Sequence, residues 1–457
     1  MRFSVSLLSL LLLCAPVRAD LLDDAIKAEM VRRHVPGVGI LVLKDGKVVR
    51  EQGYGLANVE HGIPVGPYTV FQSASVGKTF TAALVMLLAE DGKLSLDDKI
   101  SKHLANSPKA WDEITIRHLL THTSGLGDPY RKIDFRKDYT DEELIALEGT
   151  IPMIAAPGQR WSYSNMGYHL LGFISTSAGG KFYGDQLRDR IFAPLGMSTR
   201  IISEADIVPH RAAGYDWSNG ELKNQGWVAP RLNTTADGSL YLTARDLALW
   251  DQALYGNKIL SAAIREASWT GVKLNNGTTA PYGYGWNLEP RNGHRVIAHS
   301  GSWQGFKTQF SRFVDDRLTV IVLTNSSYAK PGRFADLIAA HYVPALSPAL
   351  SQAKALNDAE PLVAARVRVT MDAFVGGRAP AGLAPAMAAI FTPETLKGFQ
   401  KEVANWGPLE HAELLERAVD GEQRRYRYRY RFRHETVIVN ISFGKNEQIE
   451  KLRFSTE

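Results

Sequence analysis

Apolar and polar positions follow two different periods along this chain, and the change of period separates strands from helices. Residues 38–51 contain two short apolar runs joined by Asp45-Gly46, a dipeptide typical of the tight turn in a β-hairpin. A second hairpin is predicted over 308–324. Between the hairpins the spacing is mostly helical, as in 79–90 and 244–255. This order predicts an α/β (α+β) fold, in which helices flank an antiparallel sheet built from distant segments and a helical subdomain is inserted.

The composition changes after residue 342, where a stretch rich in alanine, proline, serine and leucine follows. We interpret 343–361 as a linker and 362–457 as a separate small domain. Two helices are expected in it, at 362–374 and 393–403. Four strands should follow, at 410–417, 423–433, 436–443 and 449–454. Helices followed by strands predict an α+β domain, and this order is similar to that of cystatin-like and NTF2-like modules.

One strand of this small domain alternates arginine with aromatic residues over 425–433. Because successive side chains of a strand point to opposite faces, the aromatics should lie on one face and the arginines on the other. One interpretation is a surface that binds anionic cell-wall or lipid phosphate groups. The other, which we favour, is a half-buried strand whose basic face is solvated.

Residues 1–19 are typical of a secretory signal peptide. Arg2 supplies the positive charge, 7–13 is a leucine-rich run, and small residues surround the expected cleavage after Ala19. The first domain would then span 20–342, and Cys14, the single cysteine, would be removed with the signal. A mature chain without disulfides fits export to the periplasm or to the outside of a bacterial cell. An uncleaved membrane anchor is the alternative.

Length and charge narrow the class of protein further. The chain has 457 residues, of which 45% are hydrophobic and 22% are charged, with a formal net charge of +5. These values predict a globular protein of two or three domains. A net charge of this size does not indicate a nucleic-acid partner. No apolar run beyond the N-terminus approaches the roughly 18 residues that span a membrane, so no transmembrane segment is expected in the mature chain.

Two motifs that could indicate a cofactor or a metal lack essential residues. Gly77-Lys78-Thr79 is similar to the end of a P-loop, but Gln72 stands where the first glycine of that motif is required. His118 and His122 have the spacing of a zinc-binding pair, yet the glutamate of H-E-x-x-H is absent. We therefore expect no cofactor and no metal, and interpret the two histidines as structural hydrogen-bonding residues.

A candidate for covalent catalysis lies where 79–90 begins its helical pattern. Ser75 and Lys78 are three residues apart, so a helix would place both side chains on the same side. A serine hydroxyl becomes a good nucleophile when a neighbouring base takes its proton. A lysine can be that base if burial or nearby positive charge lowers its pKa. On its own, S-x-x-K also fits a helix start with a capping serine and a solvated lysine.

Two further triplets occur in an order that strengthens the catalytic interpretation. Tyr163-Ser164-Asn165 brings a phenol that can carry a proton and an amide that can bind a substrate carbonyl. His299-Ser300-Gly301 lies in a strand-like stretch before the second hairpin. A glycine there lets a substrate approach a strand edge closely.

With these motifs in this order, the chain resembles the penicillin-recognising serine hydrolases, in the branch of class C β-lactamases, serine D,D-carboxypeptidases and related esterases. Four stretches carry the resemblance: 65–82 (VGPYTVFQSASVGKTFTA), 114–126 (ITIRHLLTHTSGL), 191–197 (IFAPLGM) and 238–250 (GSLYLTARDLALW). It covers about residues 25 to 340. It implies the fold of β-lactamases and transpeptidases for the first domain.

The resemblance also implies a role for each site residue. Ser75 would form an acyl-enzyme, with Lys78 and Tyr163 carrying protons. Asn165 would position the acyl side chain, and His299, Gly301 and Ser302 would line the substrate strand. The backbone N–H groups of Ser75 and Ser302 would form the oxyanion hole, and such donors supply several kcal/mol of transition-state stabilisation.

The family usually has lysine at the position of His299. A histidine is mostly neutral at pH 7, so recognition of a substrate carboxylate should be weaker here. The expected function is an exported serine hydrolase that cleaves an ester or amide of a small-molecule or peptide substrate. A D,D-carboxypeptidase, a D-aminopeptidase, a β-lactamase acting on β-lactams and a non-catalytic binding protein of this fold are the alternatives, and a cell-wall component is a candidate partner.

Overall fold

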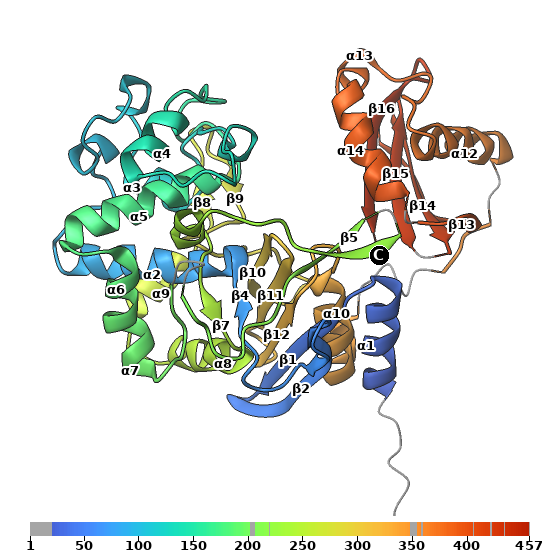
Figure 1. Cartoon of the computed structure of the whole chain (residues 1–457). Coiled ribbons are helices and arrows are strands. Elements are labelled where there is room, and N and C mark those ends of the chain that lie inside the picture. Colours follow the sequence, from blue (N-terminus) through green and yellow to red (C-terminus); the bar gives the residue numbers. More distant parts are fainter. Residues whose placement is uncertain are drawn as a thin grey trace, which may run out of the picture. The chain divides into compact units, whose positions relative to one another are not determined.

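The computed structural model describes residues 21–201, 206–218, 220–347, 354–357, 360–404, 406–420, 423–433 and 435–456. The expected signal peptide and part of the expected linker lie outside these residues. The described residues form two compact units, one within Met1–Glu289 and Arg295–Tyr342 and the other within Pro290–His294 and Val343–Glu457 (Figure 1). Each unit has its own core.

The first unit is built on a six-stranded antiparallel sheet in the order β10-β11-β12-β1-β2-β3. Its strands are β1 (Gly37–Lys44), β2 (Lys47–Asn58), β3 (Ile63–Pro64), β10 (Val296–Trp303), β11 (Phe306–Phe313) and β12 (Leu318–Thr324). Both predicted hairpins are confirmed, and Asp45 and Gly46 take the positive φ that their turn requires. The register pairs Leu41 with Ile321, so the two ends of the unit meet in one sheet.

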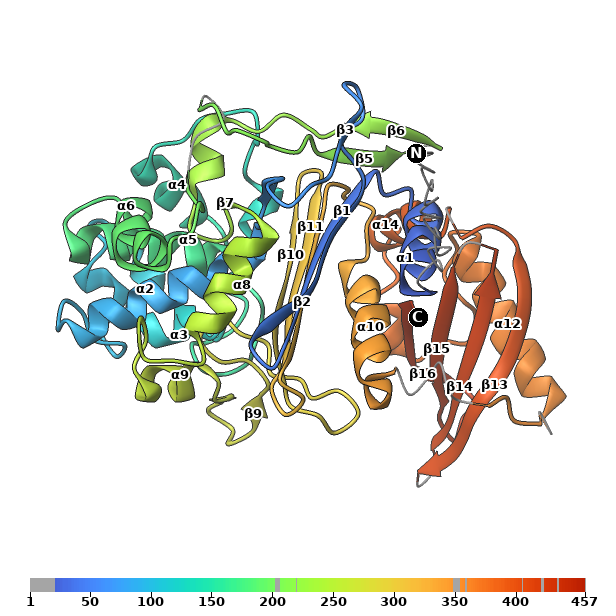
Figure 2. The ribbon, with the colours of Figure 1, turned by 90° about the horizontal axis from the view of Figure 1, so that it is seen from below.

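Helices cover both faces of this sheet (Figure 2). On one face lie α1 (Leu21–Arg32) and α10 (Pro331–Tyr342), which pack on each other. On the other face lie α8 (Ala244–Ala253) and the inserted helical region. A capping box begins α8, because Thr243 and Asp246 bond each other's backbone N–H groups.

The inserted region surrounds α2 (Lys78–Glu90), which is buried around nearly its whole circumference and packs against α5 (Asn165–Gly179). Its other helices are α3 (Ile116–Leu120), α4 (Asp141–Glu148), α6 (Tyr183–Leu187), α7 (Ala193–Leu195) and α9 (Ala262–Ser268). Short strand pairs complete the unit: β4 (Phe71–Gln72) with β7 (Tyr241–Leu242), β5 (Tyr215–Ser218) with β6 (Glu221–Asn224), and β8 (Val272–Lys273) with β9 (Thr279–Ala280).

The second unit is an α+β domain with an antiparallel sheet in the order β13-β14-β15-β16. Its elements are α12 (Pro361–Val375), α13 (Pro385–Ala388), α14 (Pro393–Val403), β13 (Leu409–Asp420), β14 (Gln423–Phe432), β15 (Thr436–Phe443) and β16 (Ile449–Thr456). The two predicted helices and four predicted strands are confirmed, whereas α13 was not expected. None of the helices in the described part of the chain has the length and apolarity to cross a membrane.

Most arginines of β14 are exposed or half-exposed, as expected, and several of them pair with acidic side chains. The aromatic side chains of this strand are buried, as predicted, but Arg429 is buried as well. Arg429 and Arg431 share Glu413 of β13, at 3.2 and 2.7 Å. Arg433 pairs with Glu410. Cross-strand glutamates therefore neutralise much of the charge that would attract an anion, which disfavours the phosphate-binding interpretation.

Candidate active site

Ser75 lies at a sharp turn between a strand and a helix. The chain leaves β4, makes one 3₁₀ turn over Ala74–Gly77 and continues as α2 from Lys78. Ala74 has φ +45°, a conformation that a residue with a β-carbon adopts only at a cost of about 1–3 kcal/mol. Thr308 of β11 donates a hydrogen bond to the carbonyl of Ser73 at 2.8 Å and so holds the turn against the sheet.

Lys78 is fully buried and directs its amine at the serine. Its Nζ lies 3.1 Å from Ser75 Oγ, 2.8 Å from Asn165 Oδ1 and 2.6 Å from the carbonyl oxygen of Asp237. These three oxygen atoms surround the amine within hydrogen-bonding distance. The amine is therefore fixed within hydrogen-bonding reach of the nucleophile candidate, which is the first requirement for a general base.

The second motif approaches the same amine from α5. Ser164 caps this helix by accepting the backbone N–H of Gly167, which places Asn165 at the first helical position. The ring of Tyr163 is 5.0 Å from Lys78 Nζ and 4.3 Å from the ring of His122. Tyr163 keeps 38% of its surface exposed, so its phenol is accessible to a substrate while Lys78 is not.

The third motif lies on β10, the edge strand of the sheet, and β10 contacts the turn that carries Ser75 (Figure 1). A β-carbon on Gly301 would lie 2.4 Å from Thr308 Oγ1 and 2.6 Å from the carbonyl oxygen of Ser73, so only glycine fits. Ser302, the next residue, is exposed. An edge strand leaves alternate backbone groups without a partner strand, as a backbone oxyanion donor requires.

His299 belongs to a hydrogen-bonded chain that joins the second and third motifs. The backbone N–H of Ser164 donates to His122 Nδ1 at 3.1 Å, and His122 Nε2 is 3.2 Å from the Tyr282 hydroxyl. That hydroxyl is 2.9 Å from His299 Nε2, and His299 Nδ1 is 2.6 Å from the Ser300 carbonyl oxygen. A backbone N–H can only donate and a carbonyl oxygen can only accept. These two ends therefore fix which atom is the donor in each hydrogen bond between them. Tyr282 therefore donates to His299, and His299 Nδ1–H donates to the carbonyl.

Burial and the nearby Lys78 charge lower the pKa of His299 to about 3. Burial and Lys78 also lower the pKa of His122 well below its ordinary value. Both imidazoles are therefore neutral near pH 7, and both ring nitrogens of His299 are already bonded. His299 thus offers neither a positive charge nor a spare N–H to a substrate carboxylate.

The sequence did not lead us to expect Asp237 and Gly238 in the site. Asp237 contacts Lys78, and Gly238 lies against the backbone of Ser75. The carbonyl oxygen of Asp237 accepts from Lys78, as described above. A β-carbon on Gly238 would lie 2.5 Å from the carbonyl carbon and oxygen of Ala74 and 2.9 Å from the nitrogen of Ser75. Gly238 opens one of the stretches that carry the family resemblance, and that was the available signal. His118 lies outside the site and caps α3 with Thr115.

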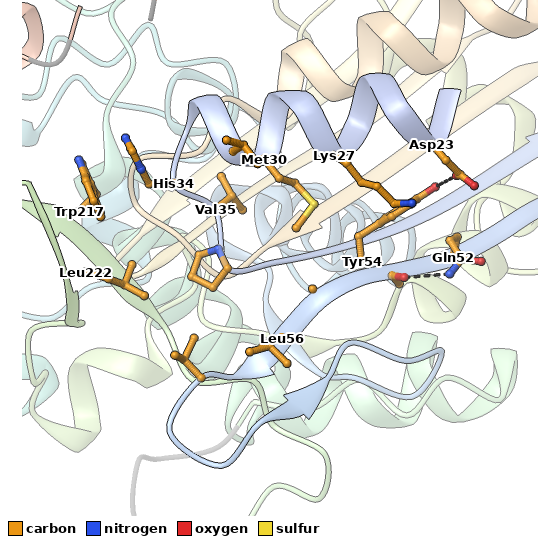
Figure 3. A pocket seen from close by; sticks show the side chains of 15 residues that line it. Asp23, Lys27, Met30, His34, Val35, Gln52, Tyr54, Leu56, Trp217 and Leu222 are labelled. Atoms are coloured by element: carbon orange, nitrogen blue, oxygen red, sulfur yellow. Dashed lines mark hydrogen bonds between the residues drawn. The ribbon is translucent and has the colours of Figure 1, made fainter. Parts of the chain in front are cut away.

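A cavity of about 810 Å³ lies elsewhere in the first unit, between α1 and β2 (Figure 3). Trp217 stacks on His34 at one end of it, and Tyr54 donates a hydrogen bond to Asp23 at the other. The described residues that line it include no serine, threonine or cysteine.

One known protein family matches most of this chain. The family model described as "Beta-lactamase" matches residues 22–343, well over half of the chain. The chain belongs to the beta-lactamase family. The family resemblance and the fold that we expected from the sequence are thereby confirmed. The chain is a serine hydrolase of this family, as are its relatives.

Two relatives show what this beta-lactamase family member is similar to. Penicillin-binding protein 4* of Bacillus subtilis is 34% identical over 309 residues, which are 63% of this chain and 67% of that protein. A D-aminopeptidase of Gluconobacter oxydans is 27% identical over 329 residues, which are 70% of this chain and 61% of that protein.

Solved structures of the beta-lactamase fold agree with this. The D-amino acid amidase of Ochrobactrum anthropi SV3, complexed with L-phenylalanine amide, has a TM-score of 0.61 at 25% identity and covers 71% of this chain and 98% of its own. The octameric penicillin-binding protein homologue of Pyrococcus abyssi has a TM-score of 0.64 at 25% identity. It covers 95% of this chain and 99% of its own, and so reaches into the second unit.

Proposed function

We propose that this protein is an exported amide or ester hydrolase that works through an acyl-Ser75 intermediate. The observation that carries the proposal is the buried amine of Lys78, held 3.1 Å from Ser75 Oγ by two further acceptors. In acylation, Ser75 Oγ attacks the substrate carbonyl carbon as its proton passes to the amine of Lys78. The C–N or C–O bond then breaks, and the leaving group receives a proton through Tyr163.

Deacylation reverses these roles. Water attacks the acyl carbon while Lys78 and Tyr163 take its proton, and Ser75 Oγ leaves and is reprotonated. The backbone N–H groups of Ser75 and Ser302 hold the oxyanion in both steps. Asn165 lies beside Lys78 and orients the acyl side chain of the substrate.

The neutral state of His299 favours substrates whose leaving group carries no carboxylate. Amides and simple esters fit this condition, and the name of the D-amino acid amidase agrees with it. A β-lactamase or D,D-carboxypeptidase is the second candidate, favoured by the similarity to penicillin-binding protein 4*. These would act on cell-wall peptides or β-lactams, which carry a carboxylate.

The pattern of residues 1–19 supports export to the periplasm or the outside of a bacterial cell. Cell fractionation tests this part of the proposal. Export predicts that the protein is recovered outside the cytoplasm, with its N-terminus at Asp20.

Replacing Ser75 with alanine tests the nucleophile. We expect kcat/KM for p-nitrophenyl acetate and for a D-amino acid p-nitroanilide to fall at least about 10³-fold, because the covalent route is lost. Ser101→Ala, an exposed serine of the same unit, is the matched control. A Ser75→Ala variant as active as the wild type would overturn the proposal, and an inert wild type would favour a non-catalytic binding protein.

A further inference from the structure

A row of buried ionisable side chains lies behind the catalytic lysine. Glu148 at the end of α4 and His169 on α5 are both almost fully buried, and Glu148 Oε1 is 2.6 Å from His169 Nδ1. The other ring nitrogen, His169 Nε2, forms an ion pair with Asp237 Oδ1 at 3.2 Å. One imidazole therefore connects two carboxylates from separate segments of the chain.

Asp237 is held from several sides at once. The hydroxyl of Thr235 donates to its Oδ1 at 2.7 Å, and the hydroxyl of Tyr130 donates to its Oδ2. With His169, three side chains therefore fix its carboxylate. The same residue gives its backbone carbonyl to Lys78, so its position sets the direction of the lysine amine.

Burial and neighbouring charges have opposite effects on the pKa values in this row. Burial alone would lower the pKa of His169, but the charges of Asp237 and Glu148 raise it to about 10. Burial would raise the pKa of Asp237, yet the charges of His169 and Lys78 hold it below its ordinary value. Near pH 7, His169 is therefore a cation and Asp237 an anion.

We propose that His169, anchored by Glu148, is a positioning residue that holds Asp237 in place and balances its charge, so that Lys78 can act as a base. This inference rests on the proposed function, because it takes Lys78 as the base. A buried carboxylate without a counter-cation would stabilise the ammonium form of Lys78. With His169 paired to it, Asp237 aligns the amine without holding its proton.

Other charged or titratable groups also face these two residues. Tyr163, Tyr168, His122 and His299 face Lys78. Glu148, Asp237 and Tyr130 face His169. Asp237 contacts both Lys78 and His169, so a change at His169 reaches the lysine through it.

The test is the pH dependence of kcat/KM in two variants with opposite expected shifts. His169→Gln keeps a hydrogen-bonding side chain but removes the cation. The acidic limb of the kcat/KM profile, where activity falls as the pH is lowered, should therefore move to higher pH by about one unit. Asp237→Asn removes the anion and keeps an amide for Tyr130 and Thr235, so its acidic limb should move to lower pH. His103→Gln, which breaks a histidine–carboxylate pair with Asp98 outside the site, is the control and should shift nothing.

A structural role alone would lower stability or kcat without moving the limb. Unshifted limbs, or shifts in the same direction, would therefore overturn the inference. If His169→Gln does not fold, Asp237→Asn decides alone. An acidic limb of this variant that does not move to lower pH would then refute the inference. An inert wild type would instead contradict the proposed function, so the two failures are distinguishable.

Discussion

Gly238 offers a sharp test of how closely the site is packed. The nearest atoms to a β-carbon at this position belong to the Ala74–Ser75 peptide, at 2.5 Å for the carbonyl carbon and oxygen of Ala74. Ordinary contacts begin near 3.4 Å, so Gly238→Ala requires a displacement of roughly 1 Å. That displacement acts on the backbone of the residue that carries the nucleophile.

A misplacement of about 1 Å at a reacting group costs about 100-fold in rate. We therefore expect kcat/KM of Gly238→Ala to fall about 100-fold, with a loss of about 1–3 kcal/mol in unfolding free energy from overpacking. The assay is hydrolysis of p-nitrophenyl acetate, with urea unfolding measured in parallel.

Gly66→Ala is the matched control. Nothing lies within 4 Å of its β-carbon position, and its φ lies outside the left-handed range, so activity and stability should stay near wild type. A folded Gly238→Ala variant with kcat/KM within threefold of wild type would refute the argument that this glycine sets the position of Ser75.

Three further predictions concern buried polar groups. Because burial and the Lys78 charge lower the folded pKa of His299 to about 3, the unfolded chain takes up the proton of this histidine first as the pH falls from about 6.5. This should remove about 2 kcal/mol of stability by pH 5, and urea unfolding of His299→Gln should show a smaller pH dependence than wild type. Tyr282→Phe leaves the Nε2 atom of each imidazole without its partner and should lower the unfolding free energy by about 1–3 kcal/mol; an unchanged urea midpoint would contradict the hydrogen-bonded chain. Asp251→Ala leaves the guanidinium of Arg312, 2.6 Å away and buried, without its partner, and should cost about 3–5 kcal/mol in the same measurement, where a loss below 1 kcal/mol would be contradictory.

Much of the fold could be predicted from the sequence, because local signals were strong where elements begin and turn. Asp45-Gly46 marked the first hairpin, and the helical spacing of 244–255 marked α8. The S-x-x-K spacing predicted that Lys78 meets Ser75, although Ser75 lies on a 3₁₀ turn and not within α2 itself.

Contacts between distant segments could not be predicted in this way. Asp237 follows Lys78 by 159 residues, and no local pattern shows that its carbonyl meets the lysine amine. The neutral state of His299 was expected from its ordinary pKa, whereas its bond to Tyr282 depends on tertiary packing. On β14 the period correctly gave the faces, but the glutamate that pairs with Arg429 and Arg431 comes from β13.

The central claim is that Ser75 carries an acyl group during turnover. The most direct measurement is intact mass after rapid mixing with p-nitrophenyl acetate and acid quenching, followed by peptide mapping. We expect a gain of one acetyl group on the peptide that contains Ser75, and no such gain in Ser75→Ala. Turnover of the ester with an adduct on another residue, or with the same adduct in Ser75→Ala, would contradict it.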